Sequence, residues 1–214
     1  MDANELKELH SDILKRIDGR INHFSNFWKK GDRKELFIEL VFCILTPQSR
    51  ARAAEKCIEN LLNNDLIFKA QKWEEISSQI LGVRFSRNKA KYILEARGKY
   101  MEKGDKKTLK DILLPIKKIE DKRNWIMENV KGIGMKEASH FLRNVGLGKD
   151  IAILDRHILK NLIKFEVIEK IPNLSVKNYI DIENKMKKFA KKVKIPLDHL
   201  DFVWWYKETG DIFK

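Results

Sequence analysis

The sequence contains little cysteine, proline or glycine. Cys43 and Cys57 are its only cysteines among 214 residues, so neither a disulfide framework nor a four-cysteine metal site can be built. Buried thiols in a reducing compartment explain these two residues most simply. With four prolines and ten glycines, no internal repeat or low-complexity tract is evident in the chain.

Long hydrophobic runs are also missing. No apolar segment reaches the length that a membrane-spanning helix needs. The apolar stretch KELFIELVFCIL at 34–45 is short enough to suit a buried helix of a globular core. The N-terminal segment MDANELKELH is charged and has no apolar signal-peptide region. We therefore expect a cytoplasmic protein.

Acidic residues are the minority among the charged ones. The chain has 44 Lys and Arg against 31 Asp and Glu, a formal net charge of +13. A compact protein with this excess attracts polyanions, of which nucleic acid is the commonest. A lysine-rich soluble protein without such a partner is the alternative. Because 43% of the residues are apolar, the chain can bury a core, as one domain or as two small lobes around a cleft.

Apolar residues recur at helical spacing through nearly the whole chain, and no segment alternates convincingly with a period of two. We therefore expect an all-α fold of many short helices. The expected helices span 4–17, 34–45, 49–62, 72–81, 87–101, 108–118, 121–130, 135–145, 155–166, 175–193 and 197–208. Residues 102–107 are the most linker-like segment, and residues 151–154 form an apolar, strand-like stretch.

A glycine turn joins two of these helices. Lys131-Gly132-Ile133-Gly134 lies between the helices expected at 121–130 and 135–145. The two glycines leave their amides uncovered, and these amides and the next helix N-terminus form a phosphate-binding site. Ile133 is apolar, as a residue between two packed helices should be. The pattern is a helix-hairpin-helix, which grips the DNA backbone without reading bases; an ordinary helix end is the alternative.

Lys136 and Asp155 follow this hairpin. A helix leads away from Lys136, and an extended segment returns to Asp155, so the spacing can place both at the mouth of one cleft. A helix N-terminus and partial desolvation favour a neutral lysine amine, which is a nucleophile that forms Schiff bases. A carboxylate beside it can hold the lysine, take its proton or stabilise a sugar cation. Taken singly, Lys136 is a solvated charge and Asp155 a helix cap.

The segments GIGMKEASHFLRN and AILDRHIL resemble the helix-hairpin-helix DNA glycosylases, the superfamily of endonuclease III. Within it the chain is most similar to the archaeal and bacterial second group of 8-oxoguanine DNA glycosylase/AP lyases. The likeness also includes ELVFCILT, LGVRFSRNKAKYI and the C-terminal LDFVWWYKETG with its final lysine. It implies two helical lobes in a single unit, 1–214. The first lobe would combine 1–34 with 151–214, and the second would span 35–150, with the hairpin at about 121–145.

The resemblance also implies roles for individual residues. Lys136 matches the Schiff-base lysine and Asp155 the catalytic aspartate. His157 matches the position at which relatives contact a phosphate. Phe85, next to Arg84, matches the position of a wedge side chain that enters the base stack. For base recognition the matching residues are Trp205, Asp201 and the terminal Lys214. Because Trp204 and Trp205 are adjacent on one helix, they cannot both face the same pocket.

The chain departs from the close group at Thr46-Pro47-Gln48, where that group usually has Thr-Ala-Asn. Gln at this place occurs in endonuclease III-like relatives and fills the hole that the flipped nucleotide leaves. The preference for the base opposite the lesion is therefore open. The four-cysteine iron–sulfur cluster of endonuclease III has no counterpart, so we expect no metal and no organic cofactor.

The function predicted from the resemblance is base-excision repair of 8-oxoguanine by a bifunctional N-glycosylase and AP lyase. Its partner would be double-stranded DNA that contains 8-oxoguanine. We expect a monomeric, nucleoid-associated enzyme that binds no membrane and needs no obligate protein partner. A glycosylase of the same fold for oxidised pyrimidines is one alternative. A non-catalytic helix-hairpin-helix scaffold is another, although a scaffold has no reason to keep both Lys136 and Asp155.

Overall fold

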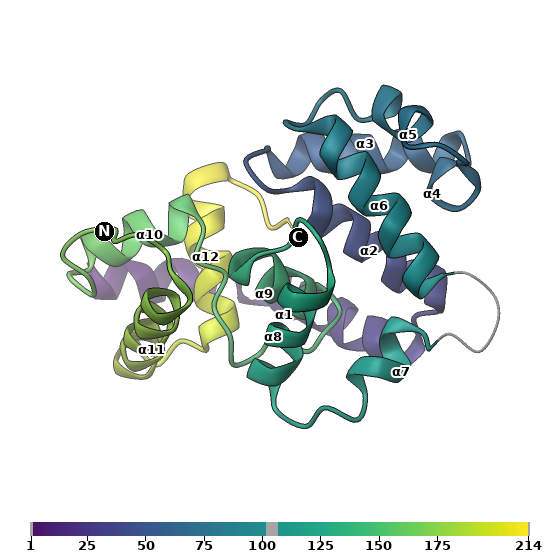
Figure 1. Ribbon diagram of the computed structural model, residues 1–214. Helices are drawn as coiled ribbons and strands as arrows, with labels where there is room; N and C mark the ends of the chain where they lie inside the picture. The colour runs from purple at the N-terminus through teal and green to yellow at the C-terminus, as the bar shows by residue number, and fades with distance from the viewer. Residues whose placement is uncertain (1, 102–106, 214) are drawn as a thin grey trace.

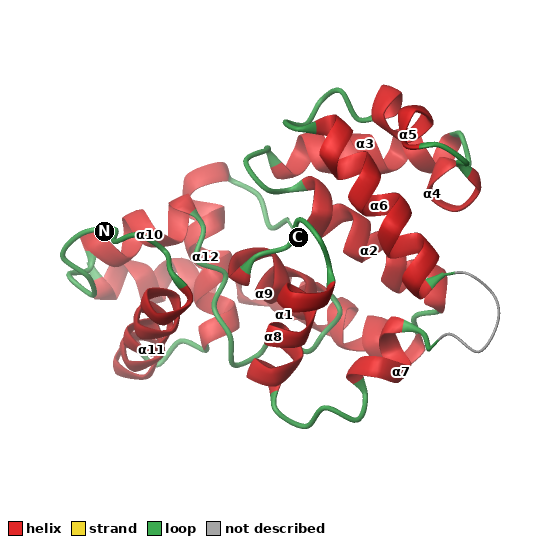
Figure 2. Cartoon of the chain, viewed as in Figure 1, coloured by secondary structure: helices red, strands yellow, loops and turns green. Residues whose placement is uncertain are grey.

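The computed structural model describes residues 2–101 and 107–213, which form helices and loops without any strand (Figures 1 and 2). The described helices are α1 (Ala3–Lys30), α2 (Arg33–Leu45), α3 (Ala51–Asn63), α4 (Leu66–Lys69), α5 (Trp73–Gln79), α6 (Ser86–Tyr100), α7 (Leu109–Leu113), α8 (Ile119–Asn129), α9 (Met135–Asn144), α10 (Arg156–Lys164), α11 (Val176–Val193) and α12 (Leu197–Thr209). The all-α prediction is confirmed.

The helix bounds differ from the sequence prediction in a few places. α1 continues to Lys30 rather than ending near 17, because buried Phe24 extends its apolar face and Gly31 ends it. α7 is shorter than predicted and stops at Leu113, since Pro115 has no amide hydrogen with which to continue the helical hydrogen bonds. The short helix α4 was not predicted, because four residues carry too little periodicity to be seen.

Two hydrophobic clusters form the core. One is built around α2, whose residues from Leu36 to Leu45 are nearly all buried, with α3 and α6 packed against it. The other joins α1, α10, α11 and α12. In Figure 1, α10, α11 and α12 lie to the left and α2 to α6 to the upper right, with α8 and α9 between them. The arrangement is one of two helical lobes.

Two features cross between the clusters. Met135 at the start of α9 packs into the α1–α12 cluster, whereas the rest of that helix packs on α2. The end of α12 is followed by a second such crossing. Ile212 packs in the α1–α12 cluster, and Phe213 packs in the α2 cluster, against Phe42. We keep the lobe boundaries at residues 34 and 150 as a proposal.

The apolar segment 151–154, which the sequence suggested to be strand-like, is a buried loop and pairs with no strand among the described residues. Its buried backbone groups bond instead to side chains of α11: Ala152 N donates to Glu183, and Leu154 N donates to Tyr179. Buried backbone groups need such partners. The segment is therefore held by α11 where it leads into Asp155 and α10.

Candidate active site

A cleft of about 1010 Å³ lies between the two lobes. Its walls include Gln48 and Arg84 from one lobe, Lys136 from α9, and four residues from the other lobe, namely Asp155, His157, Asp201 and Trp205. The structure thus gathers seven of the residues singled out in the sequence around a single cavity. Predominantly apolar clefts with a few convergent polar groups are the usual form of ligand and active sites.

The hairpin between α8 and α9 comes directly before Lys136, but its residues 131–134 are not part of the cleft wall. Gly132 has a φ of +84°, a left-handed conformation that glycine adopts without strain. Ile133 is buried between the two helices. Gly134 caps α9 in an extended conformation with no side chain bonded to the first-turn amides, so these amides stay available to a phosphate. Lys131 lies outside the cleft wall and pairs with Glu95 at 2.8 Å.

Lys136 lies in the first turn of α9, and its side chain is about one quarter exposed. Its Nζ lies 3.0 Å from Oε1 of Glu137, whose side chain is buried. The carboxylate in contact with Lys136 is therefore Glu137 rather than Asp155. Sequence reasoning missed Glu137 because neighbouring residues on a helix point in different directions unless their side chains bend back.

Asp155 is both a helix cap and a residue of the cleft. Its Oδ1 accepts hydrogen bonds from the amides of His157 and Ile158, each at 2.8 Å. Oδ2 accepts none from the described part of the chain. The carboxylate is thus oriented by the N-terminus of α10, which also favours its negative charge, and one oxygen remains for a ligand.

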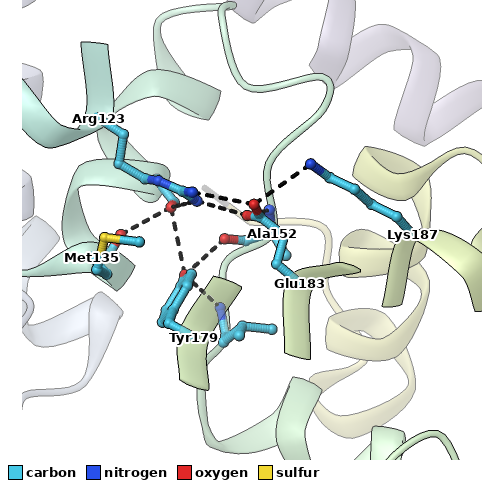
Figure 3. A network of polar contacts seen from close by, with 8 residues as sticks. Arg123, Met135, Ala152, Tyr179, Glu183 and Lys187 are labelled. Carbon is cyan, nitrogen blue, oxygen red and sulfur yellow. Dashed lines mark hydrogen bonds and ion pairs between the residues drawn. The ribbon is translucent and has the colours of Figure 1, made fainter. Parts of the chain in front are cut away.

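A buried polar network holds the two sides of the site together (Figure 3). Arg123 of α8 makes a bidentate ion pair with Glu183 of α11, at 2.6 and 3.2 Å. Glu183 also accepts from Ala152 N at 2.8 Å, and Tyr179 Oη donates to Ala152 O at 2.8 Å. Ser139 of α9 lies within 3.5 Å of both Arg123 and Tyr179. The network therefore joins the hairpin that carries Lys136 to the segment that leads to Asp155.

The pocket expected to recognise the base contains a second buried ion pair. Asp201 of α12 accepts from Arg143 Nη1 at 3.1 Å, and the Arg143 guanidinium lies 5.3 Å from the ring of Phe24 and 4.6 Å from the ring of Phe202. Burial raises the pKa of Asp201 to about 6; Arg143 opposes this rise, and the nearby charge of Asp155 adds to it. Arg143 was missed from sequence, where it reads as one more cation in a basic helix.

Trp204 and Trp205 have different surroundings, as helix geometry requires of adjacent residues. Trp204 is fully buried and stacks on Phe165 and Phe189, whose rings also contact each other. Trp205 lines the cleft, and its ring meets the His157 ring edge-on at 5.3 Å. The terminal Lys214 lies outside the described residues.

Gln48 and Phe85 share an unusual backbone geometry. Both are non-glycine residues with positive φ, +52° and +59°, a conformation that costs energy and concentrates at functional sites. Gln48 is exposed at the cleft, and Phe85 is 53% exposed with the Arg84 guanidinium 5.3 Å from its ring. An exposed aromatic ring beside a cation suits contact with bases and phosphates.

Within residues 2–101 and 107–213, no three His, Cys, Asp or Glu side chains gather as metal ligands would. No described helix has the length and apolar character to span a membrane.

The all-helical lobes, the hairpin and the cleft beside it define a helix-hairpin-helix DNA glycosylase fold. The model of the 8-oxoguanine DNA glycosylase family matches residues 17–195. An 8-oxoguanine DNA glycosylase/AP lyase of Fusobacterium nucleatum is 47% identical over 212 residues, 99% of this chain and 97% of that protein. The chain therefore belongs to the 8-oxoguanine DNA glycosylase family.

Two crystal structures show the same architecture over nearly the whole chain. The Methanocaldococcus jannaschii 8-oxoguanine glycosylase/lyase, in complex with a 15mer DNA containing 8-oxoguanine, matches with a TM-score of 0.87 and 36% identity, covering 99% of both chains. The 8-oxoguanine DNA glycosylase of Thermotoga maritima matches with a TM-score of 0.86 and 28% identity, over 99% of this chain and 98% of the other.

Proposed function

We propose that this protein excises 8-oxoguanine from double-stranded DNA and then cleaves the strand as an AP lyase, in base-excision repair. The observation that carries the proposal is the placement of Lys136 and Asp155 in the wall of one cleft, directly after the hairpin. The relatives' names supply the lesion. The enzyme acts as a monomer without an obligate protein partner, on DNA of the nucleoid.

Recognition begins with the DNA backbone. The damaged base cannot be reached inside a duplex, so the nucleotide rotates out of the stack at a cost of a few kcal/mol. Phosphate contacts from the amides of Gly132, Ile133 and Gly134, from Lys131 and from His157 offset this cost. Trp205, Asp201 and Lys214 bind the flipped base. Gln48 and the Arg84–Phe85 turn occupy the space in the duplex that the flipped nucleotide leaves.

Lys136 supplies the nucleophile. Glu137, whose Oε1 lies 3.0 Å from Nζ, accepts the proton that the ammonium must lose. The amine then forms a bond to C1′ of the deoxyribose, and the glycosidic bond breaks with its electron pair leaving on the base. Asp155 stabilises the positive charge that develops on the sugar.

The lyase step uses the same lysine. The nitrogen bound to C1′ loses a proton and its electron pair forms the C1′=N bond. The C1′–O4′ bond breaks and O4′ takes up a proton, which leaves a protonated Schiff base between C1′ and Lys136. Loss of a proton from C2′ then allows the C3′–O bond to break, which expels the 3′ phosphate, and water releases Lys136 from the sugar product. Because the lysine provides the electron sink, these steps require no metal or organic cofactor.

A strand-cleavage assay tests this function on a duplex with one 8-oxoguanine opposite cytosine. The wild-type protein should nick the damaged strand at the lesion. Lys136→Gln should abolish base release and nicking while DNA binding survives. Lys160→Gln removes the same charge from an exposed position of α10 and should keep both activities. Parallel loss of binding and activity in Lys136→Gln would count against the proposed role of Lys136.

A further inference from the structure

Lys89 is a buried lysine that the proposed mechanism does not use. It lies on α6 with only 3% of its surface exposed. Its Nζ donates to Leu45 O at 2.7 Å, to Pro47 O at 2.8 Å and to Ser49 Oγ at 3.0 Å. All three acceptors belong to the end of α2 and the turn that follows, so the amine is bound by that turn on three sides.

Ser49 connects this turn to a second one. Its Oγ also accepts from the backbone amide of Arg84 at 3.0 Å. Arg84 precedes Phe85, so one hydroxyl and one ammonium join residues 45–49 to residues 84–85. The two turns are far apart in sequence, and each contains an exposed side chain on a left-handed residue, Gln48 in one and Phe85 in the other.

We propose that Lys89 is a positioning residue that locks the Gln48 turn and the Arg84–Phe85 turn into one rigid unit, which occupies the duplex where the damaged nucleotide leaves. This inference rests on the proposed function, since it requires a duplex from which the damaged nucleotide is flipped. Lys89 acts through the backbone that it binds, and the reacting atoms are handled by Lys136 and Asp155.

The chemistry of the contacts supports positioning over mere burial. An amine buried among carbonyl oxygens is costly to keep unless its hydrogen bonds are satisfied, and three directional donors fix a turn more tightly than apolar packing can. Gln48 and Phe85, which both have positive φ, also need surrounding structure that holds them. Burial lowers the pKa of Lys89 to about 8, and the nearby negative charge of Glu137 opposes this decrease.

Lys89→Met tests the inference because it keeps the length of the side chain and removes the donors. It should slow single-turnover excision of 8-oxoguanine from a duplex by about 10- to 100-fold, since misplacing a positioned group costs that much. On an abasic site in single-stranded DNA, where no opposite strand needs to be engaged, the lyase rate should change by less than about twofold. Lys91→Met removes an exposed charge from the same helix and should change neither rate.

A second readout is independent of chemistry. A duplex with 2-aminopurine opposite a stable abasic analogue reports contact between inserted side chains and the orphan base through its fluorescence. Wild-type protein and Lys91→Met should change this fluorescence, and Lys89→Met should lose most of the change at saturating protein. Absence of 8-oxoguanine excision by the wild-type protein would overturn the proposed function, while the fluorescence would still test Lys89.

Equal loss on duplex and single-stranded substrates by Lys89→Met would overturn the inference, as would unchanged excision and fluorescence. If Lys89→Met does not fold, as judged by its thermal transition, Ser49→Ala decides. That variant removes one acceptor of Lys89 and the link to Arg84 N. It should show the same selective loss at smaller size, and a folded Ser49→Ala without that selectivity would contradict the role of Lys89.

Discussion

At the scale of single residues, Asp201 is the group in the cleft with a distinct dependence on pH. Burial raises its pKa to about 6 from an ordinary value of 3.8. Because the folded protein holds this proton more tightly than the unfolded chain, the stability that the proton contributes is complete below about pH 4. It is lost as the pH rises through about 6.

Asp201→Asn should remove this dependence. The free energy of unfolding of the wild-type protein, relative to Asp201→Asn, should decrease by a few kcal/mol as the pH rises from about 4 to about 6. Denaturant unfolding of both proteins at several pH values measures this difference. Parallel pH profiles would show that Asp201 titrates in its ordinary range.

Single residues also show where prediction from sequence ends. Lys136 and Asp155 were predicted to share one cleft because their types and their spacing after a glycine turn are characteristic, and both residues line the cleft. Glu137, Lys89 and Arg143 were missed because the sequence identifies them only as charges. Their importance comes from burial and from partners such as Leu45 O and Asp201, which are far away in the chain.

At the scale of elements, the hairpin offers a matched pair of glycines. A Cβ at Gly132 would lie 2.5 Å from Tyr92 Cδ2 and would sit on a left-handed backbone. Gly132→Ala should therefore lower the free energy of unfolding by roughly 1–3 kcal/mol and weaken DNA binding. Thermal unfolding and fluorescence anisotropy measure the two effects.

Gly134→Ala is the control for this prediction. Its Cβ would make only an ordinary contact, 3.6 Å from Glu137 Oε2, so the unfolding free energy should change by less than about 1 kcal/mol. DNA binding should still decrease, because the methyl group lies beside the first-turn amides of α9. Normal DNA affinity in both variants would argue against phosphate binding at the hairpin.

The network of α8, α9 and α11 gives a second prediction at this scale. Glu183→Gln leaves the Arg123 guanidinium buried without its carboxylate (Figure 3) and should destabilise the fold by roughly 3 kcal/mol. Lys187→Met removes only the partly exposed partner of Glu183, at 3.5 Å, and should cost less than about 1 kcal/mol. Similar losses in both variants, measured by urea unfolding, would contradict the importance of the buried pair.

Most helices of this fold could be predicted because apolar spacing and capping residues are local signals. The segment 151–154 is apolar and buried, as its composition indicates, but it forms a loop rather than a strand, and the sequence does not show what its backbone binds. Tyr179 and Glu183 lie more than twenty residues further along the chain. From the sequence alone, Tyr179 and Glu183 cannot be told apart from residues on a solvent-exposed polar face of a long helix.

At the scale of the whole molecule, the net charge of +13 has a measurable consequence. Binding to undamaged duplex DNA should weaken steeply with salt, by roughly a thousandfold between ~50 and ~200 mM if about six phosphates are contacted. Anisotropy titrations at several salt concentrations give the slope. A flat dependence would show that the basic surface does not contact the DNA backbone.

The two lobes were foreseen from the family resemblance, but the path of the chain end was not. The C-terminal segment crosses from one core cluster to the other, and Arg52 of α3 pairs with Asp211 and stacks on Phe213 at 4.1 Å. Such tertiary contacts depend on where α12 ends relative to α3. No local pattern in the sequence encodes that distance.

Borohydride trapping tests the central claim most directly, with one duplex that contains 8-oxoguanine, one undamaged duplex and one with an oxidised pyrimidine. We predict a covalent protein–DNA adduct on the 8-oxoguanine duplex alone, and its absence in Lys136→Gln. An adduct only with the oxidised pyrimidine would keep the lysine chemistry and overturn the substrate. Tight binding without an adduct on any of the three duplexes would contradict the account and favour a non-catalytic DNA-binding protein.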